Sequence, residues 1–182
     1  MQHSFSELLT PIQTTNDLFQ NGNIIVHNGY LYFSLFENNR HWNTATVCIN
    51  IETGKIENIF KGFAGNLILF GDKIGVVSNE TVQILHTKTH KIEIIDVSPI
   101  LRSNKLQASW NGNFFTEDGL IYFCGNNKVG IIDLNAHELL WQNSFEISDT
   151  EYNINRQVMD IQLHNNRFYV HCSDNTLHIF EK

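Results

Sequence analysis

The feature of this sequence that most constrains its fold is a fourfold internal repeat. Two short apolar runs joined by a tight polar turn recur along the chain, with the turns at Gly29, Asp72, Gly119 and Asn166. These turn positions are separated by 43, 47 and 47 residues. Asn-Gly, Gly-Asp and Asp-Gly pairs are typical of two-residue β-hairpin turns, because Gly and Asn tolerate the positive φ that such turns need. The sequence therefore predicts four modules that each begin with a hairpin.

Each module continues in the same order after its hairpin. A polar break at 37–43, 79–80, 126–127 or 174–175 is followed by a third apolar run, at 47–49, 82–85, 129–132 or 177–180. A second tight turn and a fourth run near 55–60, 91–95 and 138–145 complete the first three modules, whereas the fourth module has only three runs. Four short antiparallel strands in about 45 residues are the size of one β-propeller blade.

These modules predict an all-β, single-domain protein, a small β-propeller of about four four-stranded antiparallel blades. The repeats cover approximately 22–64, 65–111, 112–157 and 158–182, and residues 1–21 precede them. The strand missing from the last blade comes from this N-terminal segment or from a partner, including an open arc completed by a second copy. The segment could also form a short helix, because Ser4 and Glu7 form a possible capping box. Many strands are apolar on both faces, which suits sheets buried between neighbours.

The composition narrows the classes of partner. Lys plus Arg number 12 and Asp plus Glu 19, which gives a formal net charge of −7 without any basic run. Nucleic acid is therefore not an expected partner, because phosphate binding needs clustered cations. No apolar run reaches the roughly 18 residues of a membrane helix, and no secretory signal is visible, so we expect a cytoplasmic protein. Cys48, Cys124 and Cys172 lie in apolar runs, as small buried hydrophobes of a reducing compartment do.

The turn after the third run carries fragments of a known motif. Asn50-Ile51-Glu52-Thr53-Gly54-Lys55 has a Thr-Gly pair, and the third module has Asp133 and Trp141 at the ends of the same span, with Ala136-His137 in place of Thr-Gly. This pattern resembles the quinoprotein-type (PQQ-like) β-propeller repeat, roughly Asp-x-x-Thr-Gly-x-x-x-Trp. The resemblance implies a propeller fold over about residues 22–181. Because each module matches only part of the motif, the resemblance bears on the fold more than on an activity.

Catalytic and metal-binding patterns are not evident in the sequence. His86 and His90 are four residues apart but flank a predicted turn, so helical spacing does not bring them together. The chain has no Cys-x-x-Cys, no phosphate-binding glycine loop and no Gly-x-Ser-x-Gly. We therefore predict a protein that is not an enzyme and that has no metal and no cofactor.

The long loops are predicted to share one edge of the modules. In a four-stranded meander, the loop between strands two and three lies at the same edge as the connection to the next module. The loops at 37–43, 96–111 and 146–157 all belong to these two kinds, and binding residues often lie on such loops. The candidate partner-binding residues are Arg40, His41, Trp42, Arg102, Lys105, Trp110, Glu146, Asp149, Glu151, Tyr152 and Arg156. Trp, Tyr and Arg are enriched in interface hot spots, although the tryptophans could instead pack against their own loops.

Together these features favour a protein-binding module without catalysis. Its most concrete form is an immunity-type inhibitor, which would neutralise a toxin or enzyme through the long-loop face, with a basic toxin domain as a possible partner of this acidic chain. One alternative is a ligand-binding or enzymatic propeller related to quinoproteins, with its site in a central channel. Another is a scaffold subunit of a larger assembly. The sequence leaves open whether the chain is a monomer or a dimer.

Overall fold

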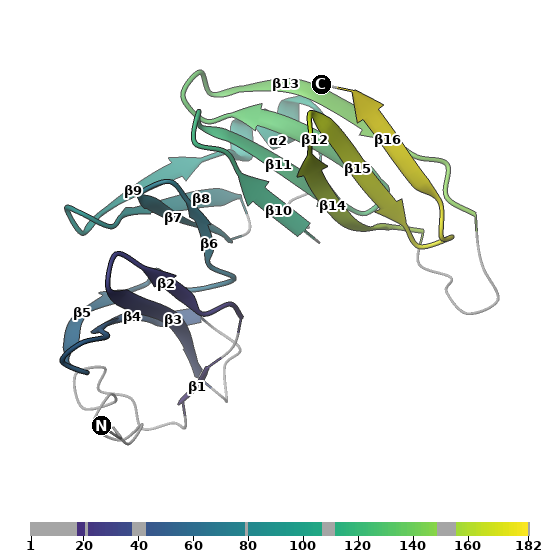
Figure 1. Ribbon diagram of the computed structural model, residues 1–182. Helices are drawn as coiled ribbons and strands as arrows, with labels where there is room; N and C mark the ends of the chain where they lie inside the picture. The colour runs from purple at the N-terminus through teal and green to yellow at the C-terminus, as the bar shows by residue number, and fades with distance from the viewer. Residues whose placement is uncertain are drawn as a thin grey trace. The chain divides into compact units, whose positions relative to one another are not determined.

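The computed structural model describes residues 18–20, 22–37, 43–78, 80–106, 112–148 and 156–181, which are almost entirely β-strands (Figure 1). The strands form four separate antiparallel sheets, one for each predicted module. The all-β prediction with four meandering modules is thereby confirmed. The chain divides into two units, residues 1–76 with 83–93 and residues 77–82 with 94–182, and each unit is considered by itself below.

The first two sheets follow the predicted strand order. The first sheet contains β1 (Leu18–Gln20), β2 (Ile25–His27), β3 (Tyr30–Glu37), β4 (Asn43–Asn50) and β5 (Ile56–Lys61). Both β1 and β2 pair with β3, while β4 and β5 follow on its other side. The second sheet has the order β6 (Ile68–Phe70), β7 (Lys73–Ser78), β8 (Thr81–His86) and β9 (Lys91–Asp96). Of the N-terminal segment, Leu18–Gln20 thus belongs to the first sheet, and residues 1–17 lie outside the described residues.

The last two sheets differ by one strand. The third sheet has the order β10 (Gly112–Phe115), β11 (Leu120–Gly125), β12 (Lys128–Asp133) and β13 (Glu138–Ser144). The fourth sheet contains β14 (Val158–His164), β15 (Arg167–Cys172) and β16 (Leu177–Glu181), as the sequence predicted. Closure of the four sheets into a propeller stays a prediction.

The hairpin turns have the predicted backbone conformation. Asn28 and Gly29 between β2 and β3 have φ angles of 50° and 79°, and Asn165 and Asn166 between β14 and β15 have φ angles of 49° and 60°. Two successive positive φ angles define the turn that matches the right-handed twist of adjoining strands. The turn residues therefore fix the register of these hairpins.

The hydrophobic core consists of side chains between facing sheets. In the first unit, Ile25, Tyr32 and Cys48 of the first sheet pack with Leu67, Ile74 and Leu85 of the second. In the second unit, the third and fourth sheets face one another (Figure 1) through a cluster that is richer in aromatic rings. This cluster includes Tyr122, Cys124, Val129, Phe145, Val158, Ile161, Phe168, Val170 and Cys172. In β3 the consecutive residues Tyr32 to Leu35 are all buried, which confirms a strand covered on both faces.

Two local features complete the fold. The predicted loop after β9 contains a short helix, α2 (Ser98–Ser103), with Pro99 in its first turn. Pro is favourable there because the first helical N–H groups have no partner within the helix. The three cysteines are buried thiols, as predicted. Among the residues that the structure describes, no helix is long and apolar enough to cross a membrane.

Candidate functional site

The centre of the candidate site is the turn between β11 and β12 in the second unit. The backbone N–H of Phe145, just after β13, donates to the carbonyl of Asn127 at 2.9 Å, and the Asn127 side-chain amide donates to the carbonyl of Phe145 at 3.0 Å. The neighbouring carbonyl of Asn126 accepts from the N–H of Val158, the first residue of β14. This two-residue turn therefore holds both the exit from the third sheet and the entry to the fourth.

The turn between β15 and β16 supports the same edge. The Asp174 carboxylate accepts hydrogen bonds from the Thr176 hydroxyl at 2.5 Å and from the N–H of Ser148 at 3.1 Å. These bonds, with the Thr176 hydroxyl contributing most, hold the pKa of Asp174 below its ordinary value. Gln157 and Ser173 are joined by two further bonds, from N–H to Oγ at 3.2 Å and from N–H to carbonyl at 2.9 Å. The described ends of the long 145–157 loop are thus fixed to two turns of the sheets.

Two recesses adjoin at Asn127. The larger has a volume of about 490 Å³ and is lined by Asn127, Phe145, Glu146, Ile147, Ser148 and Arg156. The smaller has a volume of about 110 Å³ and is lined by Lys105, Leu106, Phe123, Gly125, Asn126, Asn127 and Lys128. The Lys128 ammonium donates to the carbonyl of Lys105 at 3.2 Å, so it connects the segment after α2 to the start of β12. Buried apolar side chains and charged groups of both signs surround this edge, which suits side chains of a protein partner.

The helix α2 is fixed beside this edge by Glu80. The Glu80 carbonyl accepts from the N–H of Val97, and its carboxylate accepts from the Arg102 guanidinium at 2.7 Å. This hydrogen bond raises the pKa of Arg102. The side chains are largely exposed, so the pair contributes little to stability. Asp96 accepts a bond from the N–H of Ser98 at the start of the helix, and its pKa is lowered by Ser98.

The structure brings together three of the residues expected from the sequence. Lys105, Glu146 and Arg156 line the two adjoining recesses, and Arg102 lies on α2 in its pair with Glu80. The other predicted residues lie outside the described residues, namely Arg40, His41, Trp42, Trp110, Asp149, Glu151 and Tyr152. Sequence reasoning treated Asn126, Asn127 and Asp174 only as polar breaks between strands. Their recurrence at the same point of each module is the signal that could have placed them at the site.

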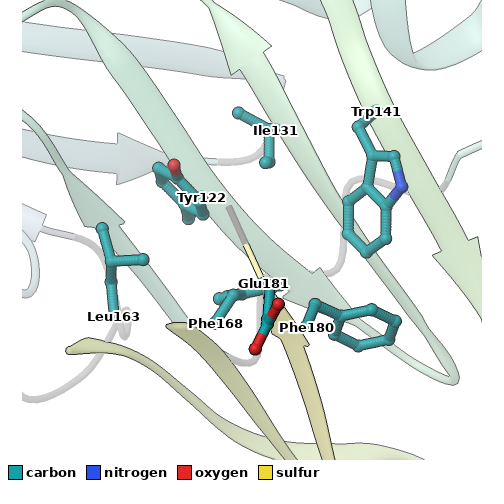
Figure 2. Close-up of a pocket in the computed structure, with 7 residues that line it drawn as sticks. All are labelled: Tyr122, Ile131, Trp141, Leu163, Phe168, Phe180 and Glu181. Atoms are coloured by element: carbon teal, nitrogen blue, oxygen red, sulfur yellow. The ribbon is translucent and has the colours of Figure 1, made fainter. Parts of the chain in front are cut away.

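A second cavity lies between the third and fourth sheets (Figure 2). It has a volume of about 170 Å³ and is lined by Tyr122, Ile131, Trp141, Leu163, Phe168, Phe180 and Glu181. The Trp141 ring centroid lies 5.3 Å from that of Phe180 and 6.1 Å from that of Phe168, both edge to face. Glu181 is exposed and lies 3.6 Å from Arg167. This aromatic lining offers dispersion contacts but no acid–base pair, so the cavity is suited to apolar groups.

The histidines and thiols do not form a reactive cluster in the part of the chain that the structure describes. There, no three His, Cys, Asp or Glu side chains gather as a metal site would require. His86 lies 3.5 Å from Glu93, and His90 lies 3.4 Å from the Asn58 amide. Burial raises the pKa of the Cys48 and Cys172 thiols, which makes both poor nucleophiles.

Comparisons with known proteins define the fold alone. No family model matches the sequence, and no curated protein matches it. The chain is similar in structure to the computationally designed Ika4 protein, with a TM-score of 0.60 and 10% identity over 92% of each chain. It is also similar to the extracellular domain of the hybrid two-component system BT4673 from B. thetaiotaomicron, with a TM-score of 0.58 and 15% identity. That match covers 87% of this chain but only 21% of the other.

Proposed function

We propose that this chain is a non-catalytic, cytoplasmic protein-binding module of the β-propeller type. The observation that carries the proposal is the pair of recesses that adjoin at Asn127 on the loop edge. Their residues come from the α2 segment, the β11–β12 turn and the described ends of the β13–β14 connection. Several loops held by a rigid scaffold around one depression are typical of protein-binding surfaces.

The charges at this edge favour a partner of mixed charge. Lys105, Lys128 and Arg156 supply positive charge, and Glu146 supplies negative charge within the same two linings. Complementary charges at an interface set orientation and association rate more than affinity. The formal net charge of −7 favours approach of a partner whose overall surface is basic.

The concrete form of this function is an immunity-type inhibitor that covers the working surface of a toxin or another enzyme. Such a role needs no catalytic group on this chain, only a complementary surface. A basic toxin domain fits the overall charge, and the rim residues would set its orientation. We expect this chain to bind such a domain and to abolish its activity at a one-to-one molar ratio.

The proposal is tested with charge reversals on and away from the loop edge. In affinity capture from an extract of the source organism, the wild-type chain is expected to retain one defined protein. We expect Lys105→Glu and Glu146→Lys to lose that protein. Lys91→Glu and Glu57→Lys, which are exposed on outer strands of the first unit, should retain it. Equal retention by all four variants would contradict a binding role for this edge.

The same capture extends to the loops outside the described residues. We expect Trp42→Ala and Trp110→Ala to weaken retention if the predicted face includes these loops. A folded double variant that retains the partner as well as the wild type would remove both tryptophans from the proposed face.

A further inference from the structure

The aromatic cavity between the third and fourth sheets has two walls, and each wall is one row of cross-strand neighbours. In the third sheet, Tyr122 of β11 lies opposite Ile131 of β12, and Ile131 lies opposite Trp141 of β13. The fourth sheet supplies the equivalent row across β14, β15 and β16, which consists of Leu163, Phe168 and Phe180. Cross-strand neighbours point to the same face of a sheet. Both rows therefore face the space between the two sheets, as Figure 2 shows.

The cavity is closed at one end and open to solvent at the other. Tyr122 and Phe168 form the closed end, because they are buried, whereas Trp141 and Phe180 are only partly buried. Glu181 is the charged residue of the lining, and its carboxylate is largely exposed. The interior is thus apolar and carries no formal charge from the described residues. Such a pocket suits an uncharged ligand, because a charged one would lose its hydration without gaining a partner.

The size and shape of this space suit a flat ring system. An apolar cavity of about 150 Å³ is large enough to bind benzene. This cavity has a volume of about 170 Å³, and at the packing density of protein interiors, about 0.75, a ligand of about 130 Å³ fills it. Two fused rings have about that volume. Trp141 is inclined by 83° to Phe168 and by 66° to Phe180, so the lining offers both ring faces and ring edges to a planar guest.

The buried Tyr122 hydroxyl lacks a hydrogen-bond partner among the described residues. Tyr122 and Tyr32 each lie three residues after the hairpin turn of their module, at Gly119 and Gly29. Tyr32 lies opposite Cys48 and bonds to its thiol, whereas the residue opposite Tyr122 is an isoleucine, which has no polar group. A buried hydroxyl without a partner is unfavourable, and a tyrosine hydroxyl can both donate and accept. The cavity therefore combines an apolar lining with one unused polar group.

We propose that this cavity binds a small, uncharged aromatic molecule of the indole type, with two fused rings and one N–H group. The rings lie among Trp141, Phe168 and Phe180, and the N–H donates to the Tyr122 hydroxyl oxygen. The ligand contacts both sheets of the second unit, so its binding stabilises their packing. The cavity shares no residue with the two recesses at Asn127, and its failure as a ligand site leaves the proposed function standing.

The test compares indole with indene by isothermal titration calorimetry. The two molecules have nearly the same shape, and indene has a CH₂ group in place of the N–H. The wild-type chain is expected to bind indole with a dissociation constant below about 1 mM, and indene about five- to tenfold more weakly. Tyr122→Phe keeps the ring and removes the hydroxyl. It should weaken indole to the level of indene and leave indene unchanged, because a change in the packing alone would affect both ligands.

A second pair of variants places the ligand in the cavity. Leu163→Trp fills the space and should abolish the binding of both molecules. Leu140→Trp is the matched control, because Leu140 is exposed on β13 and lies outside the lining. Circular dichroism and thermal melting establish that each variant folds, and the Tyr122→Phe comparison decides the proposal by itself if Leu163→Trp does not.

Three results would overturn the proposal. The first is a wild-type chain that does not bind indole at millimolar concentration. The second is an equal loss of indole and indene in Tyr122→Phe, which would mean that the hydroxyl does not contact the ligand. The third is a folded Leu163→Trp variant that binds indole as tightly as the wild type, which would place the ligand elsewhere.

Discussion

Tyr122 and Tyr169 occupy the same position in successive modules and have different surroundings. The Tyr122 ring stacks on Phe114 with centroids 4.6 Å apart and contacts Phe168 across the sheet interface. Tyr169 lies on the outward face of the fourth sheet and is only partly buried. The hairpin positions are equivalent, so the difference comes from the cover: the fourth sheet packs on Tyr122, whereas no described strand of the second unit packs on the face that carries Tyr169. The repeat therefore sets which residues face outward, and the neighbour decides whether they become core.

The largest expected effect is the difference in folding stability between alanine variants of these two tyrosines. Tyr122→Ala should lower the free energy of unfolding by about 3–5 kcal/mol, because it removes a fully buried ring from a packed cluster. Tyr169→Ala should cost less than about 1 kcal/mol, because its ring is only partly buried on the outward face of the fourth sheet. Urea denaturation measures both values. Similar costs for the two substitutions would show that the fourth sheet is covered within a single chain.

A smaller effect on stability is expected when the hydroxyl group is removed from Tyr122 or from Tyr32, its counterpart in the first module. The Tyr122 hydroxyl is buried without a hydrogen-bond partner in the described part of the chain, whereas the Tyr32 hydroxyl bonds to the Cys48 thiol. Burial first, and then Cys48, raises the pKa of Tyr32. Tyr122→Phe should therefore be neutral or should stabilise by about 1 kcal/mol, because it removes an unpaired buried hydroxyl. Tyr32→Phe should destabilise by up to about 1 kcal/mol.

The control for this pair is the double variant. The two tyrosines lie in different clusters, so their effects on the free energy of unfolding should add. If Tyr122→Phe destabilised the chain as much as Tyr32→Phe does, the Tyr122 hydroxyl would form a hydrogen bond in the folded protein, contrary to this account.

The smallest expected effect is a difference in the pH dependence of the two turns that hold the ends of the β13–β14 connection. Asn127 binds Phe145 through an amide that does not titrate, whereas Asp174 binds the N–H of Ser148 through a carboxylate. Because the pKa of Asp174 is lowered in the fold, its contribution is complete above the unfolded pKa of about 3.9. That contribution is lost as the pH falls through the lower folded value. Hydrogen-exchange protection at Ser148 should therefore fall in acid, while protection at Phe145 persists.

Asp174→Asn is the matched variant for this measurement. It should lower the protection of Ser148 at neutral pH and leave little further pH dependence. Loss of protection at Phe145 and Ser148 together would mean that the whole loop edge opens as one unit.

Most of the β-structure was predictable because its signals are local. The pairs Asn28-Gly29 and Asn165-Asn166 require positive φ angles, so they place hairpins without knowledge of the rest of the fold. The helix α2 was missed because its sequence was treated as a loop, although Ser98-Pro99 is a common helix start. Alternation was weak in β3 because both of its faces are buried.

The site was less predictable because it depends on contacts between distant segments. Loop length pointed to Lys105, Glu146 and Arg156, which line the adjoining recesses. It could not show that Asn127 joins those recesses, because that depends on the bond between Asn127 and Phe145 across 18 positions of the chain. The aromatic cavity beside Trp141 depends likewise on how two sheets face one another.

The most direct test of this account is hydrogen exchange at β12 and β16, the same strand of two successive modules. In the folded wild-type chain, the amides of β12 should exchange slowly, because this strand is paired on both sides. The amides of β16 that point away from β15 should exchange fast, because β16 pairs with β15 alone among the described strands. Amides of β16 that exchange as slowly as those of β12 would contradict this difference between the two modules.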